Sequence, residues 1–284
     1  MTGCLLKLKE IMNDLNPSEK KAAKYLINNT EDAIGISIGE LSERSGASKA
    51  AVVRLCKTLG FNGYRELAIE IATDIASQRK VENEYTDIRP GDQLETIIKN
   101  VCHNNRKSIE DTLQILDSKE IGKAVNAIHK TKRISFYGVG ASGIVAQDGS
   151  QKFLRINKFS EAYTDPHLQV TSAANLTKGD VAVVISYSGE TKDIIETMRV
   201  AKQSGATIIA VSKFGKSTLG EEADIKLFLS SPETSMRSGA MGSRIAQLCV
   251  VDVVFSGVAS LEYQQIKGCL DRTFKVASRK ENLK

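Results

Sequence analysis

Residues 179–194 read GDVAVVISYSGETKDI, in which an apolar run leads into a polar loop and then into a helical pattern. An unbroken apolar run of this length is typical of a strand buried on both faces, as in a parallel sheet. The loop that follows, residues 186–191, holds two serines, a glycine and a threonine. Because ligands bind at the carboxyl ends of parallel strands, this loop is the first candidate for a binding site.

Short apolar runs alternate with helical patterns on both sides of this stretch. We expect strands at 133–139, 159–163, 180–187, 207–212 and 225–230. We expect helices at 142–156, 190–203, 237–259 and 261–278. Strands and helices that alternate at this spacing predict an α/β fold, with a five-stranded parallel sheet flanked by helices on both faces.

The first part of the chain shows helical patterns alone. We expect one helix from Pro17, capped by Asn16 and Glu19. Further helices are expected at 37–45, 48–58, 63–77, 93–117 and 119–129. Residues 78–92 are polar and include a Pro-Gly pair, which is typical of a linker. The expected organisation is an all-α domain at 1–77, a linker at 78–92 and an α/β domain at 93–284.

Within the all-α domain, residues 38–60 read IGELSERSGASKAAVVRLCKTLG and have the pattern of a helix-turn-helix. Gly46 permits the tight turn, and Ser48 is placed to cap the second helix. Val52 and Leu55 would pack that helix onto the first. In such a pair the second helix enters the DNA major groove, and its N-terminal residues contact base edges.

The charges of this region favour DNA binding. From Arg44 to Arg65 there are five basic residues and no acidic one, as contact with phosphates requires. Backbone N–H groups and a cation at the helix start near Tyr64 would also hold a phosphate. The expected DNA contacts are Arg44, Ser48, Lys49, Ala50, Arg54, Lys57, Tyr64 and Arg65. The alternative is an ordinary helical hairpin with a solvated basic face.

The serine-rich loop at 186–191 has the chemistry of an anion site. The hydroxyls of Ser186, Ser188 and Thr191 can all point into one concavity, and Gly189 lets the backbone approach a ligand closely. The N-terminus of the helix that follows favours an anion, so a phosphate fits without a fixed cation. No P-loop pattern G-x-x-x-x-G-K-[ST] occurs, so no nucleotide is implied. The alternative is a plain strand-to-helix turn.

A second glycine-rich loop, YGVGASG at 137–143, ends the first expected strand. Gly140 and Ser142 precede a helix there, in the same way as the serine-rich loop does. The glycine spacing does not match a dinucleotide fingerprint, so we expect no NAD. Two such loops at neighbouring strand ends favour a small phosphorylated ligand.

The composition limits the remaining possibilities. The net charge is +5, and the five cysteines are scattered without a C-x-x-C pair, so we expect reduced thiols, no metal and no cofactor. The most apolar stretch, residues 245–259, contains Gln247 and Asp252 and is shorter than a bilayer span. The N-terminus has no apolar segment typical of a signal peptide. We therefore expect a cytoplasmic protein without membrane contact.

The two halves together resemble the RpiR/MurR family of bacterial transcription regulators, which join a helix-turn-helix domain to a sugar isomerase (SIS) domain. The resemblance covers nearly the whole chain and rests on NPSEKKAAKYLINN, VVRLCKTLGFNGYREL, FYGVGASGIVAQDGSQKFLRIN, GDVAVVISYSGETKDI and GSRIAQLCVVDVVF. It implies a regulator of sugar or amino-sugar catabolism whose operator binding is controlled by a phosphorylated sugar. The effector that it suggests is N-acetylmuramic acid 6-phosphate.

The same resemblance implies the residues of the effector site. The expected ligand contacts are Gly140, Ser142, Ser186, Tyr187, Ser188, Gly189, Glu190 and Thr191. Tyr187 and Gly189 would contribute backbone groups, and Glu190, His167 and Glu233 are candidates for sugar hydroxyls.

A regulator of this kind is expected to be a homodimer or homotetramer that reads an inverted-repeat operator. We expect no enzymatic activity, because an operator-reading domain serves a sensor and not a catalyst. The alternative is an SIS-fold sugar-phosphate isomerase or related enzyme with an N-terminal interaction module. Coupling between the domains is expected to pass through residues 77–92.

Overall fold

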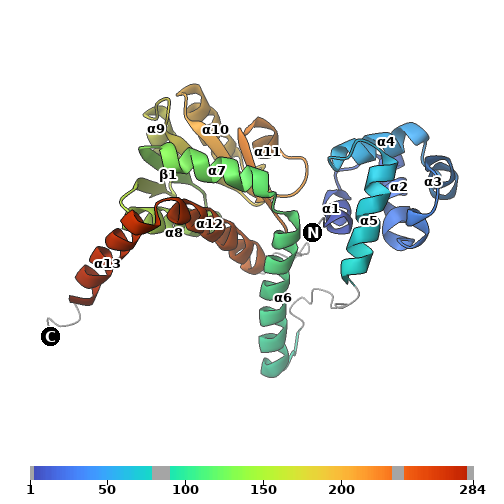
Figure 1. Cartoon of the computed structure of the whole chain (residues 1–284), viewed down its shortest axis with the longest axis horizontal. Coiled ribbons are helices and arrows are strands. Elements are labelled where there is room, and N and C mark those ends of the chain that lie inside the picture. The colour runs from blue at the N-terminus through green and yellow to red at the C-terminus, as the bar shows by residue number, and fades with distance from the viewer. Residues whose placement is uncertain (1–2, 79–89, 232–239, 280–284) are drawn as a thin grey trace.

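The computed structural model describes residues 3–78, 90–231 and 240–279 (Figure 1). The N-terminal part is helical and contains α1 (Cys4–Ile11), α2 (Pro17–Asn28), the 3₁₀ helix η1 (Asp32–Ile34), α3 (Ile38–Ser45), α4 (Lys49–Thr58) and α5 (Tyr64–Gln78). The apolar faces of these helices meet in one core, whose fully buried members include Leu8, Leu26, Leu41 and Leu55.

Local signals set where the helices of this part begin and end. Asn16 and Glu19 form the expected capping box at the start of α2. Gly46 has a φ of 64°, a left-handed conformation that ends α3 and that glycine adopts without strain. Ser48 then caps α4 by accepting a hydrogen bond from the N–H of Ala51 at 3.2 Å. The helix-turn-helix is therefore formed as the sequence predicts.

The C-terminal part is a parallel sheet surrounded by helices. Its strands are β1 (Arg133–Tyr137), β2 (Phe159–Tyr163), β3 (Val181–Ile185), β4 (Thr207–Lys213) and β5 (Ile225–Leu229). They lie in the order β2-β1-β3-β4-β5. The helices are α6 (Leu94–Ile115), α7 (Ser118–Lys130), α8 (Ala141–Arg155), α9 (Pro166–Ala174), α10 (Lys192–Gln203), α11 (Thr218–Glu222), α12 (Met241–Leu261) and α13 (Tyr263–Arg279). The expected α/β fold with a five-stranded parallel sheet is confirmed.

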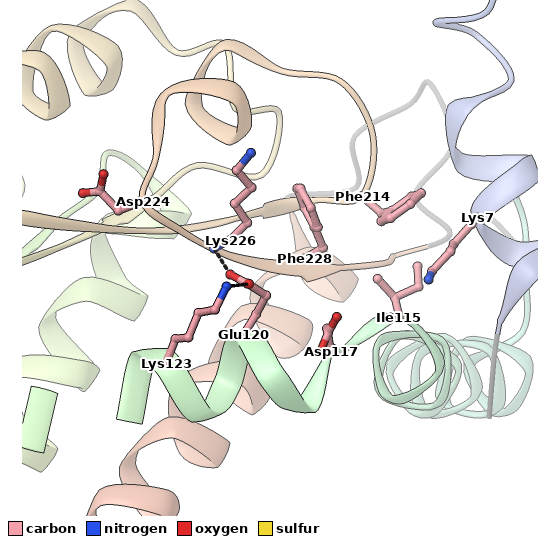
Figure 2. A pocket seen from close by; sticks show the side chains of 9 residues that line it. All are labelled: Lys7, Ile115, Asp117, Glu120, Lys123, Phe214, Asp224, Lys226 and Phe228. Atoms are coloured by element: carbon pink, nitrogen blue, oxygen red, sulfur yellow. Dashed lines mark hydrogen bonds and ion pairs between the residues drawn. The ribbon is translucent and has the colours of Figure 1, made fainter. Parts of the chain in front are cut away.

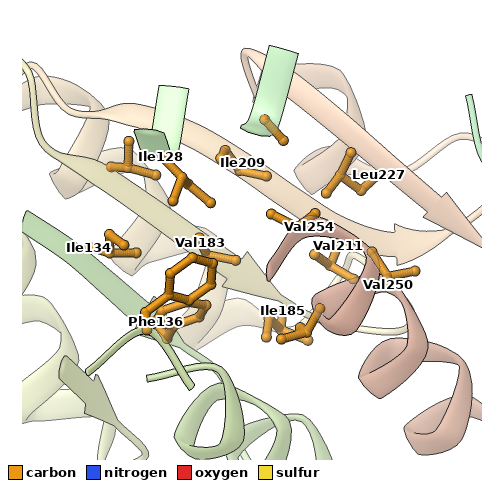
Figure 3. Close-up of a cluster of buried hydrophobic side chains, with 14 of the residues drawn as sticks. Ile128, Ile134, Phe136, Val183, Ile185, Ile209, Val211, Leu227, Val250 and Val254 are labelled. Carbon is orange, nitrogen blue, oxygen red and sulfur yellow. The ribbon is translucent and has the colours of Figure 1, made fainter. Parts of the chain in front are cut away.

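Helices cover both faces of the sheet because its strands are apolar on both sides. On one face, α7, α8 and α12 pack against side chains that include Phe136, Val183 and Val211 (Figure 3). On the other face, α9, α10 and α11 pack against Tyr137 and Val184. All five residues of β3 are buried, which explains the unbroken apolar run in the sequence.

Three short α-helices, together with η1, are not among the expected elements. α1, α9 and α11 have eight, nine and five residues, too few for a helical period to stand out from the flanking loops. β1 and β3 also end two residues earlier than expected, because the glycine-rich and serine-rich loops begin there. The expected start of α12 at 237 lies outside the described residues.

Helix α12 corrects one expectation. It has 21 residues and is long and apolar enough to cross a bilayer by length and composition alone, so the apolar stretch is not too short. In the fold, however, its buried face packs against the sheet and α8 through residues such as Val250 and Val254. About a third of this apolar window is buried in the described structure.

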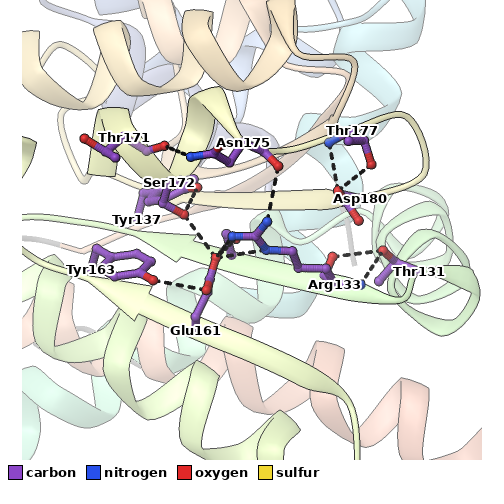
Figure 4. A network of polar contacts seen from close by, with 11 residues as sticks. Thr131, Arg133, Tyr137, Glu161, Tyr163, Thr171, Ser172, Asn175, Thr177 and Asp180 are labelled. Carbon is purple, nitrogen blue, oxygen red and sulfur yellow. Dashed lines mark hydrogen bonds and ion pairs between the residues drawn. The ribbon is translucent and has the colours of Figure 1, made fainter. Parts of the chain in front are cut away.

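A polar cluster links β1, β2 and α9 (Figure 4). The carboxylate of Glu161 accepts hydrogen bonds from Arg133 at 2.5 Å, and from Ser135 and Ser172 at 2.8 and 3.0 Å. Tyr163 donates to its other oxygen at 3.1 Å. Burial alone would raise the pKa of Glu161, but these hydrogen bonds and the charge of Arg133 outweigh burial and lower that pKa.

This cluster predicts a loss of stability in mild acid. Because the fold holds the pKa of Glu161 below its ordinary value of 4.5, the ionised carboxylate stabilises the protein above that pH, and the contribution is lost as the pH falls further. Melting temperatures measured from neutral pH down into the acid range should fall more steeply in the wild type than in Glu161→Gln. The variant should also be less stable at neutral pH. If the melting temperatures of the wild type and of Glu161→Gln fall in parallel as the pH is lowered, this assignment is wrong.

Candidate functional site

The loop between β3 and α10 is tied together by its own hydroxyls. Ser186 is buried, and its Oγ lies 3.0 Å from Oγ1 of Thr191 and accepts a hydrogen bond from the N–H of Gly189 at 3.2 Å. Oγ of Ser188 accepts a hydrogen bond from the N–H of Glu190 at 3.3 Å. The three predicted hydroxyls therefore belong to one compact turn at the carboxyl end of the sheet.

Two helices at this edge of the sheet leave their first N–H groups without a side-chain acceptor. Among the helices that follow β1 to β4 in the described residues, α9 and α11 are capped by Asp165 and Ser217. α8 and α10, which begin after Gly140 and Thr191, have no such cap. The hydroxyl of Thr191 is instead paired with Ser186. Uncapped helix N-termini bind anions, so the two loops singled out in the sequence are the two suited to a phosphate.

The order of the strands places these two loops at neighbouring positions. β1 and β3 pair directly, with Ile134 opposite Val181. The chain leaves β1 toward β2 on one side and leaves β3 toward β4 on the other. In open parallel sheets, ligands bind in the crevice where the strand order reverses in this way. The region beyond the carboxyl ends of β1 and β3 is therefore the candidate effector site.

The glycine-rich loop brings in a residue that the sequence analysis missed. The side-chain amide of Gln247, on α12, lies 3.1–3.3 Å from Oγ of Ser142. Gln247 is 1% exposed, and a buried amide needs hydrogen-bond partners. It therefore orients the hydroxyl of Ser142. The one sign of this role in the sequence was Gln247 itself, an amide side chain within the most apolar stretch, residues 245–259.

Other predicted effector residues lie in different surroundings. The carboxylate of Glu190 accepts hydrogen bonds from the N–H and the hydroxyl of Thr218, at 2.7 and 2.9 Å. The carboxylate clamps the loop to α11, and its contact with a ligand stays a prediction. The hydroxyl of Tyr187 donates to the carbonyl of Ser231 at 2.8 Å. His167 is exposed in the first turn of α9, and Glu233 lies outside the described residues.

Gly189 is required by the geometry of the serine-rich loop. Its φ is 68°, and a Cβ at this position would lie 2.4 Å from Oγ of Ser217. We expect Gly189→Ala to displace the loop, to weaken anion binding and to lower the melting temperature. Gly122→Ala on α7 is the matched control, because an added Cβ there meets nothing within 4 Å and should stabilise the helix by about 0.5–1 kcal/mol. If calorimetry gives Gly189→Ala the same melting temperature as the wild type, this expectation is wrong.

The exposed side of α4 carries the residues expected to contact DNA. Val52 and Leu55 on this helix are buried against the rest of the domain. The exposed residues of α4 include Lys49, Ala50, Arg54 and Lys57, and Ser48, Arg44 and Arg65 are exposed beside them. An accessible first turn on the second helix is the arrangement that a recognition helix needs. Contact with DNA stays a prediction for these residues.

The side chain of Tyr64 lies in the helical core. Its side chain is buried, and its hydroxyl donates to the carbonyl of Ala33 at 2.7 Å. Burial raises the pKa of Tyr64 to about 12. The side chain therefore stabilises the helical core and does not reach DNA. The phosphate contact expected at this helix start is made by backbone N–H groups, and it stays a prediction.

Arg54 has an acidic neighbour that the local sequence does not show. Its Nε donates to Oε1 of Glu19, on α2, at 2.8 Å. Residues 44–65 contain no acidic residue, but the fold places the carboxylate of Glu19 beside Arg54. Glu19 is buried, whereas the Arg54 side chain is 56% exposed. Because a guanidinium has five N–H donors, this one bond orients Arg54 and leaves donors for a nucleic acid.

Together the fold and the two sites define a class of protein, a transcription regulator that joins a helix-turn-helix domain to a sugar isomerase domain. Residues 2–78 match the helix-turn-helix domain model of the rpiR family, and residues 127–257 match the SIS domain model. The chain is 43% identical over 279 residues to an uncharacterised HTH-type transcriptional regulator of Caldanaerobacter subterraneus subsp. tengcongensis, with 98% of both chains covered. This protein belongs to the RpiR family of transcription regulators.

Two further relatives support this assignment. The HTH-type transcriptional regulator HexR of Pseudomonas aeruginosa is 31% identical over 258 residues, which covers 91% of this chain and 90% of HexR. The structure of the Vibrio vulnificus NanR protein, complexed with ManNAc-6P, is similar with a TM-score of 0.61 and 26% identity. That likeness covers 97% of this chain and 98% of the NanR chain.

Proposed function

We propose that this protein regulates genes of sugar or amino-sugar catabolism, and that a phosphorylated sugar in the region beyond the carboxyl ends of β1 and β3 controls its binding to operator DNA. The observation that carries the proposal is the pair of uncapped helix N-termini, α8 and α10, at neighbouring strands. Backbone N–H groups there would bind a phosphate, and Ser186, Ser188 and Thr191 would add hydroxyl donors. The likeness to NanR, solved with an amino-sugar phosphate, supports this class of effector.

The proposal includes a cytoplasmic homodimer or homotetramer that reads an inverted repeat, since two-fold related heads bind half-sites about one helical turn apart. It includes no catalysis. The relatives named as HTH-type transcriptional regulators support binding without turnover. N-acetylmuramic acid 6-phosphate and N-acetylmannosamine 6-phosphate share a 6-phosphate and an N-acetyl group, so both are tested as effectors.

The test is thermal unfolding of the full-length protein with a panel of hexose and amino-sugar 6-phosphates. The unphosphorylated sugars and inorganic phosphate are the controls. A ligand that binds only the folded protein, present at about 100 times its Kd, stabilises it by about 2.7 kcal/mol and should raise the melting temperature by about 5–10 °C. A shift with phosphorylated sugars alone supports the proposal. If no member of the panel shifts the melting temperature, the proposal is wrong.

Product analysis of the same mixtures tests the isomerase alternative. A regulator should leave every sugar phosphate unchanged after prolonged incubation. Conversion of an aldose phosphate to its ketose isomer, at a rate proportional to protein concentration, would show an enzyme.

A further inference from the structure

Helix α1 belongs to the helical domain but also lies against the SIS domain. Oγ of Ser230 donates a hydrogen bond to Oε1 of Glu10 at 2.5 Å. Nζ of Lys7 lies 5.4 Å from the centroid of the Phe214 ring, and Phe214 packs against the core of the helical domain. Figure 2 shows Lys7 beside Phe214 at one end of a cavity of about 440 Å³ that α7 and β5 also line. Ser230 and Phe214 follow the carboxyl ends of β5 and β4.

Both of these contact points are joined to the serine-rich loop, residues 186–191, which we call the effector loop. Ser230 precedes Ser231, whose carbonyl accepts the hydrogen bond from the hydroxyl of Tyr187 at 2.8 Å. Lys213 precedes Phe214 and donates its backbone N–H to the carbonyl of Tyr187 at 2.9 Å. In both cases the residue bonded to Tyr187 is the direct neighbour in the chain of a residue that contacts α1. Ser231 follows Ser230, and Lys213 precedes Phe214.

The loop after β4 adds a third connection. It is held to the effector loop by the hydrogen bonds between Glu190 and Thr218. It also fills the space beside Gly189, where an added Cβ would meet Ser217. At its other end, an added Cβ on Gly215 would lie 3.3 Å from Oδ2 of Asp14, just after α1. The loop therefore lies beside both the effector loop and the end of α1.

We propose that α1 couples the effector loop to the helix-turn-helix domain, with the Glu10–Ser230 contact as the main link and Lys7–Phe214 as the second. This inference rests on the proposed function, because it states how the effector site regulates DNA binding. A phosphate drawn into loop 186–191 shifts Tyr187, and the backbone that carries Ser230 moves with it. The backbone at Ser230 then has one position with the effector bound and another without it. The coupling operates because the effector binds these two states of the protein with different affinity.

The Glu10–Ser230 contact is strong enough for this role. Burial raises the pKa of Glu10, and the hydrogen bond from Ser230 and the charge of Lys213 oppose that rise. Loss of one hydrogen bond to a charged group shifts an equilibrium about 10- to 100-fold. Allosteric couplings are typically about 5- to 150-fold. One such contact is therefore sufficient, and coupling does not have to pass through residues 77–92.

The test uses the full-length protein with N-acetylmannosamine 6-phosphate, or whichever sugar phosphate of the panel binds, as the probe. The DNA is a duplex obtained by in vitro selection with the ligand-free protein. Glu10→Ala and Ser230→Ala cut the link from opposite sides, and Asn13→Ala, exposed just after α1, is the matched control. Calorimetry measures probe affinity, and fluorescence anisotropy measures duplex affinity with and without saturating probe. Amide hydrogen exchange compares α1 with α3, and melting curves verify that each variant is folded.

In the wild type and in Asn13→Ala, the probe should change the duplex affinity and the exchange of α1 but not of α3. In Glu10→Ala and Ser230→Ala the probe should still bind, while its effect on duplex affinity should shrink by about 2- to 30-fold. If both variants keep the full effect, α1 is not the coupling element, although the proposed function stands. If no phosphorylated sugar binds the wild type or alters its duplex affinity, the proposed function fails and the inference fails with it.

Discussion

Ser186→Ala combined with Ser188→Ala should weaken the binding of a phosphorylated sugar at least about 100-fold. Each serine would give one hydrogen bond to a charged phosphate, and such bonds contribute about 1.5–3 kcal/mol each. Calorimetric titration of the double variant measures the loss directly. Operator binding without sugar should persist, since both serines lie in the SIS domain, far from α4 in the chain. The response of operator binding to sugar should therefore disappear.

The single variants separate ligand contact from loop structure. Ser186 is buried and bonds both Thr191 and the N–H of Gly189, so Ser186→Ala should lower affinity and melting temperature together. Ser188 is half-buried and accepts only a local bond from Glu190, so its variant should lose affinity at an unchanged melting temperature. Ser204→Ala, at the end of α10, is the control. A double variant that binds sugar like the wild type would show that the phosphate lies elsewhere.

Arg54→Ala should weaken operator binding about 5- to 150-fold, which corresponds to the 1–3 kcal/mol of a good arginine contact to a base. The side chain is 56% exposed on the helix expected to enter the major groove. Fluorescence anisotropy with the operator and with a scrambled duplex measures the effect. The loss should be larger for the operator, because base contacts carry sequence information and phosphate contacts do not. Sugar binding should be unchanged.

Two variants near Arg54 complete this test. Lys57→Ala should weaken binding to both duplexes alike and lower the slope of log affinity against log salt by about one, as loss of a phosphate contact does. Glu19→Gln removes a negative charge beside Arg54 and should strengthen binding to both. If Arg54→Ala binds the operator like the wild type, α4 is not the recognition helix. Binding that is insensitive to salt would favour a protein-interaction module.

Sequence reasoning succeeded where the deciding residues are close together in the chain. The capping box of Asn16 and Glu19, the left-handed Gly46 and the Ser48 cap each act within one helical turn. The buried strand β3 is a continuous apolar run. Sequence reasoning failed where a side chain bonds a partner that is distant in the chain. The side-chain amide of Gln247 bonds Ser142, 105 positions away, and no pattern near Gln247 shows this partner.

The amino-acid sequence by itself determined the helix-turn-helix, the alternation of strands and helices, and the hydroxyl and glycine content of both loops. Only the tertiary structure decided which of those side chains remain available. It turned Glu190 toward Thr218, 28 residues away, placed Gln247 on Ser142 across 105 residues, and joined Glu10 to Ser230 across 220. The reason is physical: local conformation depends on neighbours in the chain, whereas burial and hydrogen bonding depend on partners that the fold brings together.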